Sequence, residues 1–507
     1  MNAITYQGYR TGLSLPGTRV GKSGAPLAEP LRDGFNLILA ACVTLLTTVV
    51  FALLCPDLLG WFLIPVALCG CLSGIDMMAY VRGQVDTFDP LGVLGIFGYH
   101  FFFLAPLLTL LSGYHSKFLP AVPDWTSWIG WMAWINAAGL TLYLVSRRLF
   151  PVRRPTTAWI VRPPSFFTAI SIALPTTLGL QLFIFAKFGG VTGFMEAFSN
   201  REGATSSFTG MGYLFLVAET FPVFLAIAVL VWKRDFLKRS PWTFLGAMVL
   251  AFFVLKLFCG GLRGSRTITV FGLFWIVGAI HVWIRPVPKK FLAFGVLFIV
   301  GFMYLYGFYK DVGISALGIV DDASKIDDLE ANSGRTVYAV LLGDLGRTEI
   351  QATLLNRIVA GGDYDYAYGR TYLEAFAFMI PKALWHDRPE GKVTAGTEAL
   401  YGRGSYDPMV RRATNIYGLA GEAMLNFPPV FAPLAFIMLA CFVSRVRSFL
   451  LADKNDLRLL LVPVLCYASV LLMGSDLDNL LFASLSIAIA PLILIRCCCT
   501  SVKLGQV

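Results

Sequence analysis

Charged residues are scarce in this sequence: Asp, Glu, Lys and Arg make up 14% of its 507 residues, where soluble proteins carry about 25%. Apolar residues reach 57%, and the mean hydropathy is +0.69. These values exclude an ordinary soluble enzyme and predict one polytopic membrane domain. The net charge of +10 does not indicate nucleic-acid binding, because surplus Lys and Arg in a membrane protein normally anchor its cytoplasmic loops.

Pairs of CxxC motifs are absent, so we expect no zinc site among the ten cysteines. Half of these cysteines lie inside apolar runs, where Cys behaves as a small hydrophobic residue, and this argues against a disulfide framework. The first 35 residues lack the apolar core and the cleavage site of a signal peptide. Their many Gly and Pro residues predict a flexible cytoplasmic tail over residues 1–35.

Long apolar runs dominate the rest of the chain. A bilayer core about 30 Å thick is crossed by roughly 20 helical residues, and twelve runs approach that length. The sequence therefore predicts an all-α polytopic integral membrane protein with about twelve transmembrane helices. Their expected limits are 36–55, 58–80, 90–112, 126–146, 166–187, 209–231, 241–258, 267–284, 291–308, 416–443, 458–473 and 479–496.

Lys and Arg are distributed unevenly between the two sets of connecting segments. If the N-terminus is cytoplasmic, the inner segments hold about 23 Lys and Arg and the short outer loops about 5, the asymmetry of the positive-inside rule. Both termini are therefore expected in the cytoplasm. Residues 36–308 would form spans one to nine, residues 309–415 a large outer loop, and residues 416–507 the last three spans with a short tail.

The large outer loop has roughly 107 residues, too many for a passive connection, since structureless loops beyond about 15 residues are uncommon. Within it, Ile350, Leu354 and Ile358 recur at every fourth position. This spacing predicts an amphipathic helix over 347–360, which the following Gly-Gly pair would end.

Tyrosines crowd the next part of the loop, at 364, 366, 368 and 372. They fit an aromatic belt at the membrane interface. They equally fit sugar binding, because the face of a pyranose is apolar and the Tyr hydroxyl can bond a sugar hydroxyl. The apolar stretch 375–380 is too short to span and predicts a re-entrant or interfacial segment.

Cations are unexpectedly frequent over residues 381–412, on a face where the positive-inside trend expects few. Glycines between them let the backbone approach a ligand closely, and the guanidinium fork matches phosphate oxygens. A bound diphosphate would explain this pattern; a solvated loop whose charges pair with its own acids is the alternative. Residues 260–266, Gly-Gly-Leu-Arg-Gly-Ser-Arg, combine fixed positive charge with free N–H groups where the eighth span begins, which suits an anion or simple anchoring.

These motifs occur in an order that resembles a known family. In chain order they are Arg263-Gly-Ser-Arg266, Tyr368-Gly-Arg-Thr-Tyr372, Ile380-Pro-Lys-Ala-Leu-Trp385, Asp387-Arg388-Pro389, Thr414-Asn415-Ile-Tyr417 and Gly421-Glu422-Ala-Met-Leu-Asn426-Phe427. The pattern, mainly over residues 260–430, resembles the bacterial oligosaccharide repeat-unit polymerases, also called O-antigen polymerases.

The sequence also departs from that family's pattern. It has His386 and Arg388 where the family often has proline and lysine, and Pro428-Pro429 where glycine is common. The second difference bears on the geometry of the tenth helix. The related O-antigen ligases carry a His-Asn pair where this chain has Thr414-Asn415, which favours a polymerase.

The resemblance implies an inverting, metal-independent glycosyl transfer at the periplasmic face of the bacterial inner membrane, with no cofactor. The donor and the acceptor would both be oligosaccharides on undecaprenyl diphosphate, and undecaprenyl diphosphate would leave. The product would be O-antigen, capsule or exopolysaccharide. A chain-length regulator and a flippase would be partners, along with membrane lipid, and nucleic acid would not be one.

Site roles follow from this chemistry. The departing diphosphate needs cations, which we assign to Arg263, Arg266, Arg388 and Arg411. The acceptor hydroxyl needs a base: the candidates are Glu422, Glu398 and Asp387, with His386, Asp476 and Asp478 behind them. Glu422 lies two helical turns from Asn415 on the same face, where burial would raise its pKa and make it a better base. The alternative is that Glu422 only orders a nearby arginine through a salt bridge. Sugar binding is assigned to Tyr368, Tyr372, Trp385 and Asn415. No residue is assigned to a metal.

Three other classes remain open. A transporter or flippase of a lipid-linked oligosaccharide usually has internal repeats and ionisable residues at mid-membrane, whereas we find no repeat and expect mainly Lys256 and Glu422 within the spans. A polyprenyl-monophosphate-dependent glycosyltransferase would need an acidic motif in its first outer loop, which here has the single acid Asp57. An O-antigen ligase is the third alternative.

Overall fold

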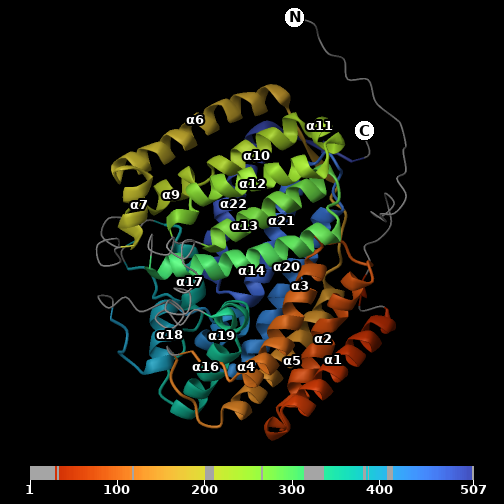
Figure 1. The fold of residues 1–507 in the computed structure, drawn as a ribbon, viewed down its shortest axis with the longest axis vertical. Coiled ribbons are helices and arrows are strands. Elements are labelled where there is room, and N and C mark those ends of the chain that lie inside the picture. The colour runs from red at the N-terminus through yellow and green to blue at the C-terminus, as the bar shows by residue number, and fades with distance from the viewer. Residues whose placement is uncertain are drawn as a thin grey trace, which may run out of the picture.

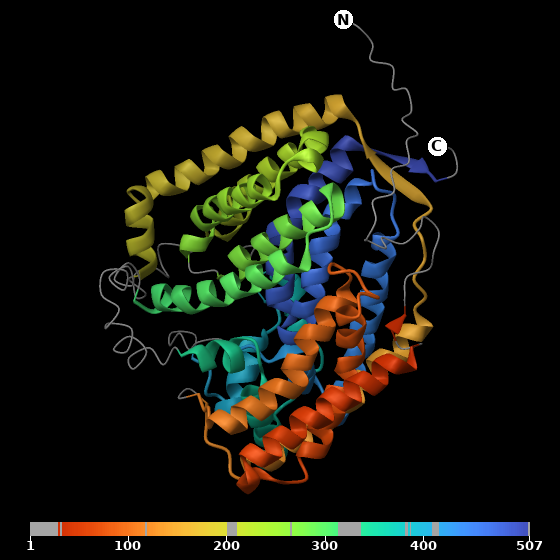
Figure 2. The ribbon, with the colours of Figure 1, turned by 45° about the vertical axis from the view of Figure 1, so that its right-hand side comes forward.

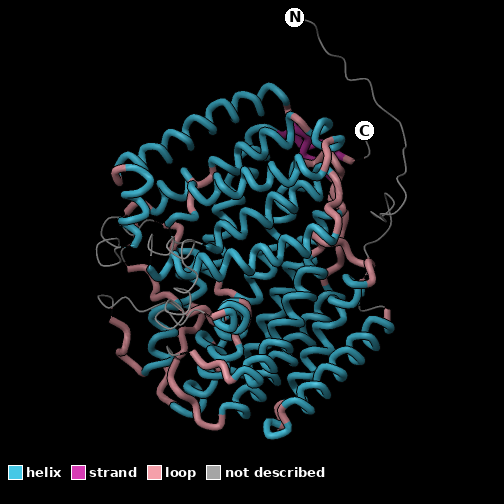
Figure 3. The backbone as a smooth tube through the Cα atoms, in the orientation of Figure 1, coloured by secondary structure: helices cyan, strands magenta, loops and turns pink. Residues whose placement is uncertain are grey.

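Twelve helices in the described part of the chain are long and apolar enough to cross a membrane (Figure 1). The structure, a computed structural model, describes residues 29–30, 33–116, 119–199, 210–263, 266–312, 336–380, 384–385, 387–407 and 415–504. It is 76% helical with almost no strand, as the tube in Figure 3 makes plain. The predicted fold class, an all-α polytopic membrane protein, is confirmed.

The first nine spans lie within a few residues of their predicted limits. Asp33 caps the first of them by accepting a hydrogen bond from the Phe35 amide. The elements of this part are α1 (Gly34–Leu54), η2 (Pro56–Leu58), α2 (Leu63–Val81), α3 (Pro90–Tyr99), η3 (His100–Leu104), α4 (Ala105–Ser112), α5 (Trp125–Leu149), β1 (Thr157–Val161), α6 (Pro163–Lys187), α7 (Gly190–Ser199), α9 (Gly212–Ala218), α10 (Phe221–Trp232), α11 (Arg234–Arg239), α12 (Trp242–Phe258), η4 (Gly261–Arg263), α13 (Arg266–Ala279), η5 (Ile280–Ile284) and α14 (Lys289–Val312).

The large loop and the last three spans complete the chain. The predicted amphipathic helix over 347–360 is confirmed as α16, and Gly362 ends it in the left-handed region at φ 73°. The remaining elements are η7 (Ala339–Asp344), α16 (Thr348–Gly361), α17 (Arg370–Ala377), α18 (Lys392–Tyr401), α19 (Gly418–Asn426), η8 (Pro429–Leu434), α20 (Ala435–Leu450), η9 (Leu457–Leu461), α21 (Val462–Gly474), α22 (Leu477–Cys498) and β2 (Cys499–Lys503).

The tenth span differs from its prediction over 416–443. The candidate span covers Pro429–Leu450, and α19 is a separate nine-residue helix before it. The cause is Pro428-Pro429: proline cannot donate a backbone hydrogen bond and disfavours a helical residue before it, so Phe427 is extended at φ −141°. Glu422 therefore lies on a short buried helix and not inside the tenth span.

Contacts between connecting segments divide the bundle into two ends. At one end, which we call the sheet end, β1 pairs antiparallel with β2, with Thr157 opposite Lys503, and the Lys289 ammonium donates to the Tyr80 carbonyl at 3.0 Å. At the other, the large-loop end, Arg266 forms an ion pair with Asp344. Connections predicted to lie inside thus meet at the sheet end, and predicted outer ones at the large-loop end, as alternating spans require.

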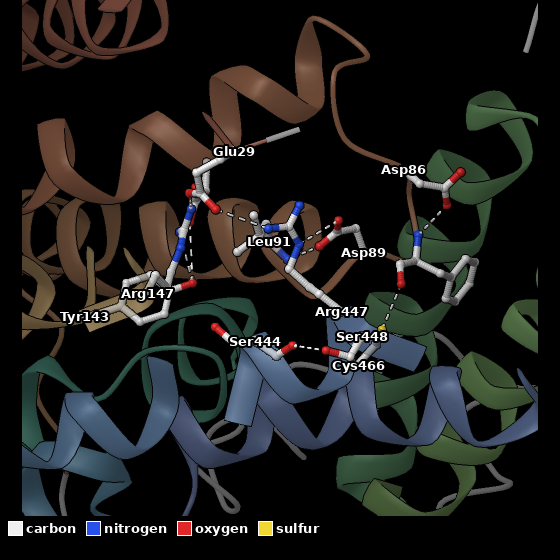
Figure 4. A network of polar contacts seen from close by, with 12 residues as sticks. Glu29, Asp86, Asp89, Leu91, Tyr143, Arg147, Ser444, Arg447, Ser448 and Cys466 are labelled. Atoms are coloured by element: carbon white, nitrogen blue, oxygen red, sulfur yellow. Dashed lines mark hydrogen bonds and ion pairs between the residues drawn. The ribbon is translucent and has the colours of Figure 1, made fainter. Parts of the chain in front are cut away.

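A buried ion network holds the sheet end together (Figure 4). Arg147 of α5 pairs with Asp76 of α2 at 2.5 Å, and Arg447 of α20 pairs with Asp89 at 3.0 Å. Glu29 lies between the two arginines and contacts both. Asp76 corrects the expectation that few ionisable residues besides Lys256 and Glu422 lie within the spans, since it sits well inside α2.

The buried apolar side chains form two large clusters, and the large loop belongs to only one of them. The first cluster joins spans two to four with α16, α18, α19 and the start of α20. The second joins α6, α10, α12 and α13 with the end of α20, α21 and α22. In both Figure 1 and Figure 2, α6 and α10–α12 lie on one side and α1 and α2 on the other, with α20–α22 between them. The two clusters thus meet along α20 and α21, each of which has buried residues in both.

Candidate functional site

The helices α16, α17, α18 and α19 lie together at the large-loop end (Figure 1). α17 packs against α22, and α18 packs against both α16 and α19. The approach of α18 is close: a Cβ on Gly396 would lie 2.1 Å from the Tyr417 hydroxyl. Glycine is therefore required at this position for the two helices to pack.

Two carboxylates connect α19 and α22. Asp476 Oδ1 accepts hydrogen bonds from the Tyr417 and Gly418 amides, both at 2.9 Å, where α19 begins. In return, Glu422 Oε2 accepts the Leu477 amide at 2.8 Å, where α22 begins. The side chains of Asp476 and Glu422 are 0% and 3% exposed, so these bonds satisfy helix-end donors that water cannot reach.

Lys392 places a buried positive charge beside this carboxylate pair. Its ammonium, at the start of α18, lies 2.5 Å from Asp476 Oδ2 and 3.0 Å from Asp478 Oδ1. Burial alone would lower the pKa of Lys392, but the two aspartates outweigh that effect and its pKa is raised. Lys392 therefore stays charged and joins the large loop to the start of α22.

The pKa of Glu422 is raised to about 8. Burial is the main cause, because it disfavours the charged carboxylate, and the neighbouring Asp476 carboxylate raises the pKa further. Burial also raises the pKa of Asp476, against the opposing effect of Lys392. Lys392 pairs with Asp476 and Asp478, and its charge only partly offsets the effect of burial and of Asp476 on the pKa of Glu422.

Asn426 joins Glu422 to the tyrosine segment. Its Nδ2 donates to Thr371 Oγ1 at 2.6 Å and its Oδ1 accepts the Gly369 amide at 2.9 Å. Thr371 Oγ1 in turn donates to Glu422 Oε1 at 3.2 Å. These bonds hold the backbone of Tyr368, whose φ is +44°, an uncommon left-handed conformation for a residue other than glycine.

The predicted sugar-binding residues are dispersed. Tyr368 is 72% exposed, and its ring stands edge-on to that of Tyr366, with 6.2 Å between ring centroids. Tyr372 is half-buried, hydrogen-bonds Asn426 and lies near Glu422 and Asp476. The other two, Trp385 and Asn415, are half-buried, and Asn415 bonds the Tyr417 side chain. Of the four, the structure brings only Tyr372 beside the carboxylates.

Three of the predicted diphosphate-binding arginines each have an acidic partner on another element. Arg263 binds Glu219 through Nε at 3.1 Å and Nη2 at 2.8 Å. Arg266 contacts both carboxylate oxygens of Asp344, at 2.7 and 2.8 Å. Arg388 lies 3.8 Å from Glu374, the loosest of the three pairs. The fourth, Arg411, lies outside the described residues, as does His386.

The remaining base candidates lie apart from the buried pair. Asp387 is exposed, and Glu398 is half-buried, with its Oε1 accepting the Gly404 amide at 3.2 Å. The short apolar stretch 375–380 ends α17 and exposes Phe376, Phe378 and Ile380, which fits its predicted place at the membrane boundary.

Sequence reasoning gave Lys392, Asp476 and Asp478 no leading role, yet they form the centre of this cluster. Lys392 was one cation among many, and the aspartates follow an apolar run far along the chain. The available signal was an Asp at the residue before the last span, a preferred N-cap position. The partners of Asp476, in contrast, come from α18 and α19. Sequence spacing does not reveal that these two helices pack near the start of α22.

Comparisons with known proteins return no match: no protein-family model, no curated protein and no solved structure is similar to this chain. Within the described residues, no group of three or more His, Cys, Asp or Glu side chains is arranged to hold a metal ion.

Proposed function

We propose that this protein polymerises oligosaccharide repeat units carried on undecaprenyl diphosphate, by inverting, metal-independent glycosyl transfer at the periplasmic face of a bacterial inner membrane. One observation carries the proposal. Arg388, a cation suited to a diphosphate, lies over the Phe378 ring at 5.7 Å. Phe378 stands edge-on to Phe482 of α22, with 6.3 Å between centroids. Arg388, the cation proposed to bind the diphosphate, thus lies on one side of this aromatic pair, and Asp476 and Asp478 at the start of α22 lie on the other.

The proposed reaction needs no redox partner. The acceptor hydroxyl attacks the anomeric carbon of the donor, its proton passes to a protein carboxylate, and the bond from that carbon to the diphosphate breaks. Arg388, with Arg263 and Arg266, stabilises the charge that develops on the departing diphosphate. To bind it, each arginine exchanges its acidic partner for phosphate oxygens, and the loose pair of Arg388 with Glu374 exchanges most readily.

The raised pKa of Glu422 suits a group that accepts a proton near neutral pH. Its surroundings set a limit on that role. One oxygen is bound to Leu477 and the other to Thr371, and only 3% of the residue is exposed. A sugar hydroxyl reaches Glu422 only if it displaces one of these bonds.

The proposal includes the sidedness of the membrane. With the sheet end in the cytoplasm, both termini are inside, and the many arginines of that end obey the positive-inside rule. The large-loop end then faces the periplasm, where lipid-linked repeat units delivered by a flippase would meet a chain-length regulator.

A deletion strain of the source bacterium tests the activity and separates the alternative classes. Loss of a polymerase leaves single repeat units on undecaprenyl diphosphate at the periplasmic face. Loss of a flippase leaves them at the cytoplasmic face, and loss of a ligase leaves long polymer on the lipid carrier. Purified protein should then convert the single-unit lipid extracted from the deletion strain into a ladder of polymer. Failure of the purified native protein to extend that lipid would contradict the proposed function.

A further inference from the structure

We propose that Asp478 is the catalytic carboxylate that takes the proton from the acceptor hydroxyl, and that Lys392 is its positioning residue. This inference rests on the proposed glycosyl transfer and identifies the group within the site that touches substrate. It replaces Glu422 in that role.

Exposure distinguishes the carboxylates of the cluster. Asp476 is 0% exposed and Glu422 is 3% exposed, and each carboxylate has both oxygens bound within the protein. The Asp478 side chain is 26% exposed. Of the three, Asp478 is the one that a sugar hydroxyl can reach without opening the junction of α19 and α22.

The hydrogen bonds of Asp478 leave one oxygen available. Oδ1 receives the Lys392 ammonium at 3.0 Å and the Asn479 amide at 2.6 Å. Within the described residues no hydrogen bond is made to Oδ2. An oxygen held on one side and open on the other is the arrangement that a base requires, because its direction is fixed before the substrate arrives.

Lys392, from its buried position, fixes the orientation of the Asp478 carboxylate. Its ammonium is shared by Asp476, which is anchored to the start of α19, and Asp478. The Lys392 side chain is 4% exposed, so it contacts the substrate only through Asp478. Asp476, held in turn by the amides that begin α19, supports this lysine from inside the protein.

Arg388, the cation that would hold the leaving diphosphate, is connected to Asp478 through two aromatic rings. Asp478 and Phe482 are four residues apart on α22 and therefore share a helix face. Phe482 packs against Phe378, and the Arg388 guanidinium lies over Phe378. An acceptor hydroxyl at Asp478 and a diphosphate at Arg388 are thus brought to the two sides of one ring pair.

The step balances without a further reactant. The acceptor O–H bond breaks and its proton goes to Asp478 Oδ2, while the oxygen forms a bond to the anomeric carbon. The bond from that carbon to the phosphate oxygen breaks, and its electron pair stays on the diphosphate. Asp478 then loses its proton to water or to the departing diphosphate.

The experiment compares Asp478→Asn with Glu422→Gln in purified protein, with single-unit lipid from the deletion strain as substrate. Asp478→Asn should lower the rate of transfer by at least about 100-fold, the usual size of a general-base contribution. Its melting temperature and its affinity for undecaprenyl diphosphate should be unchanged. Glu422→Gln should keep a rate within about 10-fold of the native protein. Asp363→Asn, an exposed carboxylate at the same end, is the matched control and should have the native rate.

Lys392→Arg and Lys392→Met test the positioning role. The arginine variant keeps a charge between the aspartates and should recover part of kcat, whereas the methionine variant should lose kcat with little change in KM.

Two outcomes overturn the assignment while the proposed function stands: native-like transfer by Asp478→Asn, or loss of transfer in Glu422→Gln with Asp478→Asn active. Absence of transfer by the native protein contradicts the proposed function itself. Carbodiimide labelling of native protein provides a measurement without mutation. Asp478 should be modified and protected by undecaprenyl diphosphate, and modification of Glu422 in its place would overturn the inference.

Discussion

Glu422 and Asp476 each accept hydrogen bonds from the first amides of the other's helix. Asp476, before α22, binds the amides that begin α19, and Glu422, within α19, binds the first amide of α22. The start of each helix is therefore capped by a carboxylate at the other. Removing Asp476 frees the amides that begin α19, and removing Glu422 frees the amide that begins α22, so each carboxylate stabilises the start of the other helix.

The stability of this junction should depend on the protonation of Glu422. Its folded pKa of about 8 is above its ordinary value of 4.5, so the fold prefers the protonated form. The stabilisation is fully present below about pH 4.5 and is lost as the pH rises through about 8. The melting temperature of native protein in detergent should therefore fall between pH 5 and pH 8.5, and less steeply in Glu422→Gln. Glu390→Gln, which changes an exposed acid, should follow the native curve; equal slopes in all three would contradict the raised pKa.

Loss of the buried ammonium should be costly. Lys392→Met leaves Asp476 without its cation inside the protein, which typically costs about 3–5 kcal/mol of unfolding free energy. The double variant Lys392→Met with Asp476→Asn should be more stable than the single one, because the charge that remains without its cation, on Asp478, is partly exposed. Denaturation in mixed micelles would measure both. If the double variant were the less stable of the two, the ion pair would not be the relevant interaction.

Replacing the paired arginines should abolish polymer formation without unfolding the protein. Arg263→Ala, Arg266→Ala and Arg388→Ala each remove a guanidinium that can bind two phosphate oxygens, and lysine should rescue only in part because it lacks the fork. Polymer on gels from the complemented deletion strain is the measurement. Arg403→Ala, at a 75% exposed arginine of the same end, should be silent. Full polymer from all three alanine variants would mean that these residues only anchor the chain.

Labelling of single cysteines tests the sidedness. An impermeant maleimide added to intact spheroplasts should label Asp363→Cys at the large-loop end. Lys454→Cys at the sheet end should react only after permeabilisation. Both positions are exposed, so a lack of reaction reflects the membrane and not burial. The reverse pattern would put the proposed site in the cytoplasm.

The buried network of the sheet end should tolerate loss of Glu29 better than loss of Arg147. Glu29→Ala still leaves each arginine with an aspartate, Asp76 or Asp89. Arg147→Met leaves Asp76 buried without a cation, which should cost several kcal/mol more. Thermal unfolding of the two variants in the same detergent gives the order. A larger loss in Glu29→Ala would mean that the N-terminal segment, and not the helix pair, holds this end.

The spans were predictable because each one needs a run of about 20 apolar residues to cross the bilayer. Such a run can be recognised in each segment without knowledge of the others. Eleven of the twelve predicted spans lie within a few residues of a candidate span. The tenth failed because an apolar run continues through Pro428-Pro429, and hydropathy does not record that proline interrupts the backbone hydrogen bonds. The end of α16 was predictable because a Gly-Gly pair is a local signal of a helix end. The pair Pro428-Pro429 is a local signal of the same kind.

The candidate site was predictable only in part. The arginines were found because cations at the predicted outer face contradict a general trend. Their partners Glu219, Asp344 and Glu374 were not found, since each lies on a different element, and long-range pairing leaves no local pattern. Lys392, Asp476 and Asp478 were missed for the same reason: the three meet only once α18 folds onto the start of α22.

The pairing of β1 with β2 has a consequence for the order in which the protein is made. Val161 lies opposite Cys499, so the connection before the fifth span finds its partner only after the span Leu477–Cys498 has been made. Eight candidate spans must be inserted before β1 can pair with β2. Until then β1 has an unpaired strand edge, and misassembly can begin at such an edge. A stop codon before residue 499 would therefore leave all twelve candidate spans intact and still release a chain in which β1 has no partner strand.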